Sequence, residues 1–292
     1  MNTFVQILVS GLTLGAMYAI STIGLSLAWG AVGVLNMAQG AFLVVGGYAA
    51  YAGAVFLGMS APLALALAAL AGAAVGAGTY FFVVRFMLES ATFETNVIIA
   101  TVGLALLFEN VMLQTFGAYP LRQPIRIEGG VNIAATYIPY ESIGILVMSI
   151  VAMIAVGWVL ERTRMGRAIR AVSQNRAAAL LMGVPVNVVY LQVLTIAGVL
   201  AALSGVMLST ITTLAPTMGY DPMLKAFIVC VVAGLGNIYG ALYAAFALGI
   251  FEAAVQFFLG VRFGFPAMLL LIILTLVWRP YGVFGRGSTQ RF

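Results

Sequence analysis

Histidine is absent from the 292 residues, and cysteine occurs only once, as Cys230. Without histidine the chain has no Ser-His or Cys-His catalytic pair and none of the usual imidazole metal ligands. A lone cysteine makes no disulfide within the chain and says nothing about the redox compartment. Lysine also occurs once, as Lys225, and no GxxxxGK(S/T) stretch is present. The chain therefore has no ordinary P-loop for a nucleotide phosphate, and any ATP must be hydrolysed by a partner.

Charged side chains are scarce as well. They make up 7% of the chain, against about 25% in a typical soluble domain. Hydrophobic residues make up 63%, and the mean hydropathy is +1.13. We therefore expect an integral membrane protein. Apolar runs of about 20 residues predict helices and not barrel strands, which alternate over about 10 residues. The net charge of +5 is concentrated in loops beside apolar runs, so it does not indicate nucleic-acid binding.

The spacing of the apolar runs predicts an all-α, polytopic fold. We expect a single domain over residues 1–292 with about eight to nine transmembrane helices, some of which can be re-entrant or broken. The expected helices are 4–27, 41–57, 62–87, 96–116, 141–160, 187–210, two runs between 225 and 259, and 265–277. Close helix packing is expected at three glycine pairs with small-xxx-small spacing, Gly11 and Gly15, Gly72 and Gly76, and Gly236 and Gly240.

The polar segments between the helices predict the topology. A hydrophilic loop at 161–186 contains Arg162, Arg164, Arg167, Arg170 and Arg176, and the positive-inside bias places it in the cytoplasm. Segments 117–140 and 212–222 are expected outside, and the second can dip back into the protein. Counting crossings puts Met1 outside and the tail with Arg279, Arg286 and Arg291 inside, unless 225–238 is a re-entrant half-span.

The loop at 161–186 has the periodicity of one or two short amphipathic helices, which Gly183 and Pro185 would end. One interpretation is purely topological, because the arginines alone would hold the loop inside. The other is functional, because an ordered, alanine-rich loop is more structure than retention requires.

Five uncharged or acidic polar residues fall within the apolar runs or their breaks. Asn36 and Gln39 lie in a glycine-rich break at bilayer depth, which is tolerated only where protein or a water-filled cavity surrounds it. They either line a substrate passage or belong to a cytoplasmic turn. Glu109 and Glu252 are intramembrane acids that need partners. For both, and for Asn237, we expect a structural role in holding helices together.

Five blocks of sequence carry a resemblance to a known family. In chain order they are GLTLGAMYAISTIGLSLAWGAVGVLNMAQGAFLVVGGYAAY, ERTRM, GRAIRAVSQNRAAALLMGVPVNVV, TIAGVLAALSGVML and LKAFIVCVVAGLGNIYGALYAAFALGIFEA. Together they resemble the LivH-type permease subunit of branched-chain amino acid ABC importers, over nearly the whole chain. The resemblance implies a multi-pass protein of the bacterial inner membrane that forms half of a translocation pathway. It implies neither an enzymatic activity nor a cofactor in this chain.

The resemblance also implies partners. These are a second, LivM-like permease subunit, two cytoplasmic subunits that bind ATP, an external solute-binding protein and membrane lipid, with no nucleic acid. It implies that the loop at 161–186 holds the coupling helix that seats in an ATPase. The expected coupling residues are Arg167, Arg170, Arg176, Ala177, Ala178, Leu181 and Gly183. The chain departs from many relatives just before the alanine run, where it has no acidic residue.

Three alternatives stay open. Relatives with similar permeases carry amides, urea or other small organic solutes, and the sequence does not name the solute. A secondary transporter or channel would work without ATP, but charged residues along mid-membrane helices are scarce here. A membrane-embedded enzyme would need paired carboxylates or a nucleophile with its base, and the two intramembrane acids are far apart in the sequence.

Overall fold

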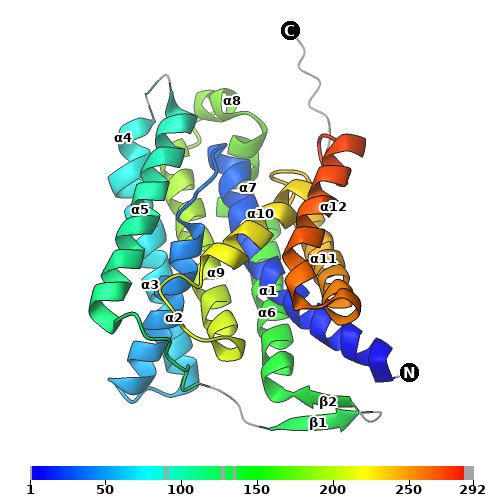
Figure 1. Ribbon diagram of the computed structural model, residues 1–292. Coiled ribbons are helices and arrows are strands. Elements are labelled where there is room, and N and C mark those ends of the chain that lie inside the picture. Colours follow the sequence, from blue (N-terminus) through cyan, green and yellow to red (C-terminus); the bar gives the residue numbers. More distant parts are fainter. Residues whose placement is uncertain (1, 89, 91, 126–128, 134–135, 286–292) are drawn as a thin grey trace.

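The computed structural model describes residues 2–88, 90, 92–125, 129–133 and 136–285, so Arg286 and Arg291 lie outside the described residues. It is a bundle of helices that run between two ends of the molecule (Figure 1). In chain order the elements are α1 (Asn2–Val32), α2 (Gln39–Val55), α3 (Ala61–Thr79), η1 (Tyr80–Val84), α4 (Arg85–Met87), α5 (Phe93–Phe116), β1 (Gly130–Ile133), β2 (Thr136–Pro139), α6 (Tyr140–Arg162), α7 (Arg164–Gln174), α8 (Arg176–Leu181), α9 (Val186–Ile211), α10 (Tyr220–Ala233), α11 (Ile238–Leu259), η2 (Val261–Phe263) and α12 (Gly264–Trp278).

Within the described residues, seven helical segments are long and apolar enough to cross a membrane. They are Thr3–Val32, Ala61–Met87, Phe93–Phe116, Tyr140–Arg162, Val186–Ile211, Ile238–Leu259 and Val261–Trp278. A helix satisfies its own backbone hydrogen bonds, which hydrocarbon cannot do for it. Prolines fall in first turns, as Pro62 does in α3, where no N–H is needed. The polytopic helical prediction is confirmed in this form.

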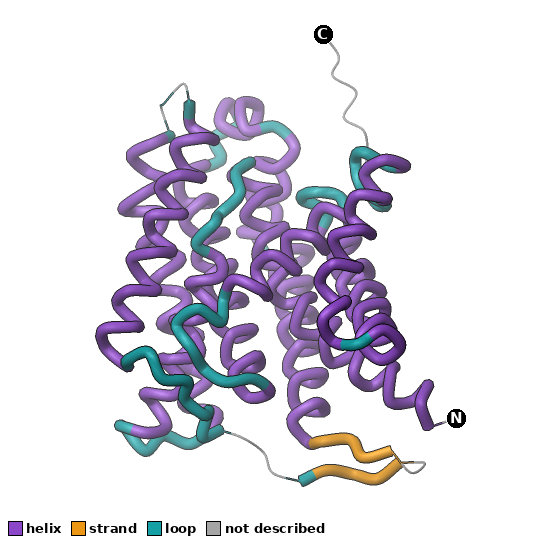
Figure 2. The backbone as a smooth tube through the Cα atoms, in the orientation of Figure 1, coloured by secondary structure: helices purple, strands orange, loops and turns teal. Residues whose placement is uncertain are grey.

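Two helices are too short to span the bundle, and we call α2 and α10 the half-helices. Each follows a long helix and a non-helical stretch, residues 33–38 after α1 and residues 212–219 after α9. Figure 2 shows both stretches as loops within the helical body. The starts of the half-helices meet there, because a Cβ on Gly40 would lie 2.7 Å from the Gly219 carbonyl oxygen. The segment at 212–222 does dip back into the protein, as the sequence suggested.

The long helices pack closely through glycines. In α1, a Cβ on Gly11 would lie 2.6 Å from the Ile250 Cα of α11. In α3, a Cβ on Gly76 would lie 2.2 Å from the Leu194 carbonyl oxygen of α9. No side chain fits at these distances, so two of the three predicted glycine pairs mark real crossings. In the third pair, Gly236 lies in the turn between α10 and α11, and Gly240 lies in the first turn of α11.

A two-stranded antiparallel hairpin, β1 with β2, is the one departure from the all-α expectation in the described residues. It lies in the segment 117–140, which was expected to be an ordered external loop. Leu121 of the same segment exchanges both backbone hydrogen bonds with Leu214, each at 2.9 Å. The chain here is extended and polar, so it satisfies its backbone groups by pairing strands instead of forming a helix.

Most of the described basic residues gather at one end of the bundle. The end of α6, all of α7 and α8, the short α4 with Arg85 and the segment with Arg279 after α12 lie together there (Figure 1). The β-hairpin and the N-terminus lie at the opposite end. We call the first the arginine-rich end, and the positive-inside bias assigns it to the cytoplasm.

Candidate functional site

The loop at 161–186 folds into the two short helices α7 and α8. Thr163 and Asn175 are their N-caps, because each side-chain oxygen accepts a hydrogen bond at 3.0 Å from the backbone N–H three residues on. Gly183 follows α8 with a φ of +79°, which glycine adopts without strain. The prediction of one or two short helices is confirmed, and α7 is amphipathic as expected. α7 buries Ile169 and Val172 and exposes Arg167.

Two arginines tie these helices to the membrane-spanning ones. Arg170 Nη1 donates a hydrogen bond of 2.7 Å to the Leu160 carbonyl oxygen near the end of α6. The Arg176 guanidinium lies 5.6 Å from the centre of the Tyr190 ring in α9, a cation–π contact. The α7–α8 helical hairpin is thus attached at both of its ends, so a force applied to α7 or α8 is transmitted to α6 and α9.

The outer surface of α8 consists of apolar side chains, with two alanines followed by larger residues. Ala177 and Ala178 are exposed, and Leu181 and Met182 are 88% and 84% exposed. Ala179 faces the bundle instead and is buried. Three consecutive large apolar residues, from Leu180 to Met182, are not covered by any of the described residues, which is typical of a surface that meets another protein.

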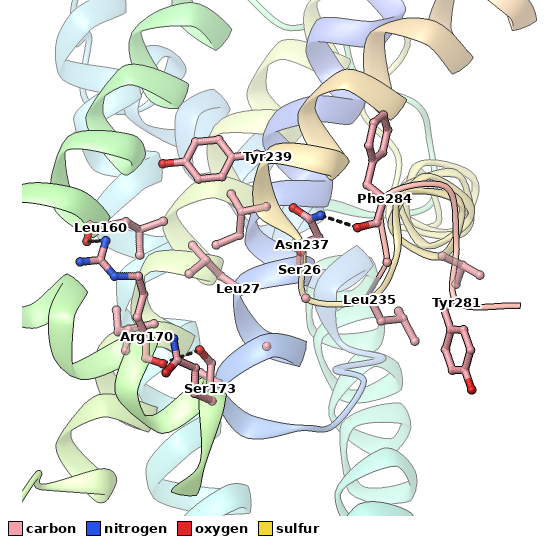
Figure 3. Close-up of a pocket in the computed structure, with 18 of the residues that line it drawn as sticks. Ser26, Leu27, Leu160, Arg170, Ser173, Leu235, Asn237, Tyr239, Tyr281 and Phe284 are labelled. Carbon is pink, nitrogen blue, oxygen red and sulfur yellow. Dashed lines mark hydrogen bonds between the residues drawn. The ribbon is translucent and has the colours of Figure 1, made fainter. Parts of the chain in front are cut away.

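A cavity of about 740 Å³ lies beside α7 at the arginine-rich end. Small-molecule sites are commonly about 300–1,000 Å³. Figure 3 shows Leu160, Arg170 and Ser173 on one side of it and Leu235, Asn237 and Phe284 on the other, with Ser26 and Leu27 of α1 between them. Its lining is mostly apolar, and the described lining residues include one arginine and no acid.

Asn237 joins three elements at the rim of this cavity. Its Oδ1 caps α11 by accepting from the Gly240 N–H at 2.9 Å, and its Nδ2 donates to the Phe284 carbonyl oxygen at 2.9 Å. The backbone N–H groups of Val283 and Phe284 in turn donate to carbonyl oxygens at the end of α10, at 2.8 and 3.1 Å. The segment 279–285 is held over the α10–α11 turn by these bonds, an arrangement that fits the structural role expected for Asn237.

Replacing Asn237 with alanine is expected to destabilise the protein by about 1–2 kcal/mol through loss of the cap. Asn237→Asp keeps the cap oxygen and loses only the donor to Phe284, so we expect a smaller decrease in melting temperature. Both variants should be cut faster by chymotrypsin after Tyr281, since the segment is less firmly held. Melting in detergent and timed proteolysis measure the two effects. Equal melting temperatures for the two variants would contradict the capping role.

Glu252 is fully buried at the centre of a polar cluster. Its Oε1 accepts hydrogen bonds from Lys225 Nζ at 2.9 Å and Gln256 Nε2 at 2.8 Å, and its Oε2 accepts from the Tyr18 hydroxyl at 2.6 Å. Lys225 Nζ also lies 2.9 Å from Asp221 Oδ2. The cluster joins α1, α10 and α11. Each described hydrogen bond of the Glu252 carboxylate is thus with a donor.

Tyr220 and Glu109 form a separate polar pair, in which the Tyr220 hydroxyl of α10 donates a hydrogen bond to the Glu109 carboxylate of α5. Asp221 follows Tyr220, and its side chain is 62% exposed. Asp221 precedes Ala233, at the arginine-rich end of α10, by 12 residues, or roughly 18 Å of helix. A charged side chain at the bilayer centre costs about 2.5–3.5 kcal/mol on insertion scales. This face of α10 must therefore be turned to water or to another protein, not to lipid.

Asn36 and Gln39 lie inside the bundle. Asn36 Oδ1 accepts from the Ala38 backbone N–H at 3.0 Å, and Gln39 Nε2 reaches the Ala197 carbonyl oxygen of α9 at 3.4 Å. Asn36 Nδ2 and Gln39 Oε1 are buried without a partner among the described residues. Both side chains make hydrogen bonds at the start of α2. Their role in a substrate passage stays a prediction.

Lys225 and Tyr220 are the residues at this depth that the sequence did not single out. Lys225 follows Asp221 by four residues, so the two share one helix face, which was the available signal. Its second partner, Glu252, lies on another helix, and nothing in the linear sequence joins them. Tyr220 likewise meets Glu109 across 111 positions of the chain.

Comparison with known proteins gives a consistent result. The family described as branched-chain amino acid transport system / permease component matches residues 7–278. The high-affinity branched-chain amino acid transport system permease protein LivH of Escherichia coli K12 is 27% identical over 99% of this chain and 97% of its own. BraD of Pseudomonas aeruginosa is 27% identical over 99% and 98%. The autoinducer 2 import system permease protein LsrC of Enterobacter sp. is 32% identical over 81% and 69%. No solved structure matches the chain.

Proposed function

The chain belongs to the branched-chain amino acid transport system permease component family, and on this premise we propose that it is the permease subunit of an ABC importer. It forms half of the pathway by which branched-chain or related amino acids cross the bacterial inner membrane. It works by alternating access, with ATP bound and hydrolysed by partner subunits and no cofactor of its own.

The observation that carries this proposal is the helical hairpin of α7 and α8 at the arginine-rich end. It exposes a small apolar surface on α8 and is fastened to α6 and α9 by Arg170 and Arg176. A cytoplasmic ATPase that grips Ala178, Leu181 and the end at Gly183 would move those two long helices. A secondary transporter has no need of such a surface.

The other partners follow from the remaining surfaces. A solute-binding protein delivers from the end that carries the β-hairpin, opposite the arginine-rich end (Figure 1). A second permease subunit covers the face of α10 that bears Asp221, because a charge there is not left against lipid. Each half-helix completes a crossing with its non-helical stretch, which gives nine crossings with the seven long segments. Nine crossings place Met1 outside and the tail inside.

The pathway runs along α10. Tyr220, Leu224 and Val231 share one helix face, and Val231 lines the cavity at the arginine-rich end. This face leads from the polar pair at mid-depth to the cavity, which serves as the exit to the cytoplasm. Asn36 and Gln39, at the start of the opposite half-helix, border the same central region.

A second candidate solute has one observation in its favour, since the LsrC relative is named for autoinducer 2 import. The solute of this chain is therefore decided by experiment. We expect proteoliposomes that contain the complete transporter to transport leucine under two conditions only. ATP must be present on the side of the membrane where the ATPase subunits lie, and the binding protein must be present on the other side. Uptake of leucine by this chain alone would contradict the proposal, and ATP-driven uptake of autoinducer 2 but not leucine would favour the second candidate.

A further inference from the structure

A polar cavity of about 250 Å³ lies at the end of the bundle that carries the β-hairpin. The segment after α5 and the end of α9 both reach this end and form the walls of the cavity (Figure 1). None of its described lining residues is acidic, and they are Arg122, Gln123, Ser209, Ile211, Thr212 and Thr213. The volume equals that of roughly eight water molecules. It is smaller than the usual site for a whole small molecule, which is about 300–1,000 Å³.

Arg122 is the cation of this cavity, and its guanidinium group has no hydrogen-bond or ion-pair partner among the described residues. Leu121 and Leu214 form an antiparallel bridge, and Arg122 follows the first as Thr213 precedes the second. Arg122 and Thr213 are therefore neighbours across the bridge, and both are exposed. The positive-inside bias disfavours an arginine at this end. A free guanidinium fork beside a hydroxyl, with no acid in the described lining, suits a carboxylate.

Gln123 lines the same cavity and is only 2% exposed. Its Nε2 donates hydrogen bonds to the Gly47 carbonyl oxygen of α2 at 3.2 Å and to Ser209 Oγ of α9 at 3.1 Å. The amide cannot be turned over, because its oxygen would then face the Gly47 carbonyl oxygen. Gln123 Oε1 is buried without a donor in the described part of the chain, which folded proteins seldom leave. The cavity thus lacks an anion for Arg122 and a donor for Gln123, and an incoming chain segment with an acidic side chain supplies both.

The segment that carries these two side chains is attached to both half-helices. Gln123 holds α2 through Gly47, and the bridge of Leu121 with Leu214 holds the stretch 212–219 that leads into α10. A loop that needed only to be solvated would not require a buried amide that reaches two helices. A force applied at Arg122 is therefore transmitted to α2, to α9 and to the start of α10.

From these observations we propose that residues 121–123 form a docking socket for the external solute-binding protein. In this socket Arg122 binds an acidic side chain of that protein, and Gln123 transmits the docking to α2 and α9. The size of the cavity favours a side chain over a whole solute. An ion pair that forms on association at an exposed arginine weakens with salt. The inference rests on the proposed function and names the contact by which this partner is recognised.

The first test measures ATP hydrolysis by the assembled transporter in nanodiscs against the concentration of its loaded binding protein. Arg122→Gln should raise the concentration for half-maximal stimulation roughly tenfold or more, and Arg122→Glu should raise it further. Arg122→Lys keeps the charge and should restore most of the affinity. Sodium chloride at about 0.5 M should weaken docking to the unmodified protein more than to Arg122→Gln, because salt screens the ion pair.

Arg262→Gln is the matched control. Arg262 is also an exposed arginine, it lies in the turn between α11 and α12, and it does not line this cavity. The control should dock as the unmodified protein does. An equal effect of Arg262→Gln, or unchanged docking to an assembled Arg122→Gln variant, overturns the socket. Competition by 4-methylpentanoate beyond that of equal sodium chloride also overturns it, since the cavity would then hold a small solute. Absent stimulation in the unmodified transporter overturns the proposed function instead.

Gln123 is a positioning residue in this proposal, so its test separates transmission from docking. Gln123→Met removes both hydrogen bonds and should lower maximal stimulation roughly fivefold or more, while the half-maximal concentration changes little. Ser209→Ala removes one of the two contacts and keeps the test if Gln123→Met does not assemble. Full maximal stimulation in an assembled Gln123→Met variant, or in Ser209→Ala where that variant replaces it, overturns the transmission role.

Discussion

Replacing Lys225 with methionine is expected to destabilise the protein by about 3–5 kcal/mol, the usual cost of leaving a buried charge without its partner. Glu252 is fully buried and accepts a 2.9 Å hydrogen bond from Lys225 Nζ. The variant keeps an unbranched side chain that is one heavy atom shorter, and it removes the ammonium group with its charge and its hydrogen-bond donors. We expect the melting temperature in detergent to fall by roughly 10 °C or more.

The matched control removes both charges. In the double variant Lys225→Met, Glu252→Gln, the amide oxygen of the new glutamine can still accept from the Tyr18 hydroxyl, and no buried charge remains unpaired. Asp221 also loses Lys225, but its side chain is 62% exposed. Buried ion pairs are often no more stabilising than neutral replacements, so most of the lost stability should return. A double variant as unstable as Lys225→Met would show that packing around Lys225, and not charge pairing, sets the stability.

The second large effect is expected at α8. Replacing Ala178 with tryptophan should reduce ATP hydrolysis stimulated by the loaded binding protein at least tenfold. Ala178 is exposed on the small apolar surface, and an indole ring there would hold a docked ATPase away from the helix. The fold should not change, because the side chain points away from the bundle. Gly183→Val should act in the same direction by straining the +79° turn that ends α8.

Ala155→Trp is the control for this effect, because Ala155 is exposed within the apolar span of α6 and not at either end of the bundle. Co-purification of all subunits and ATP hydrolysis are measured for each variant. Ala155→Trp should keep both. If Ala178→Trp assembles and retains full stimulation, α8 is not the coupling surface.

The half-helix α10 connects these two regions. Its first turn carries Tyr220 and Asp221 at mid-depth, and its end lies under the segment 279–285 beside the cavity. The hairpin borders the same cavity through Ser173. We therefore expect a movement of α7 to reach this cavity directly and the first turn of α10 through that helix.

Much of the candidate coupling site could be predicted from the sequence. Its signals are local: Thr163 and Asn175 cap helices three residues on, and Gly183 ends one. The mid-depth cluster could not be predicted in the same way. The two ends of the Lys225–Glu252 pair are 27 residues apart on different helices, and Tyr18 is 234 residues from Glu252.

The sequence by itself determined that this protein lies in a membrane and where its long apolar helices run, and its arginines predict which end faces the cytoplasm. Hydropathy and the placement of arginines act residue by residue along the chain, so no tertiary contact is needed to read them. Only the tertiary structure decided that two half-helices meet through Gly40 and Gly219. It also decided that Glu252 is neutralised by Lys225 while Asp221 stays exposed. Charge pairing at bilayer depth depends on distances of a few ångströms between helices, and a linear sequence does not contain those distances.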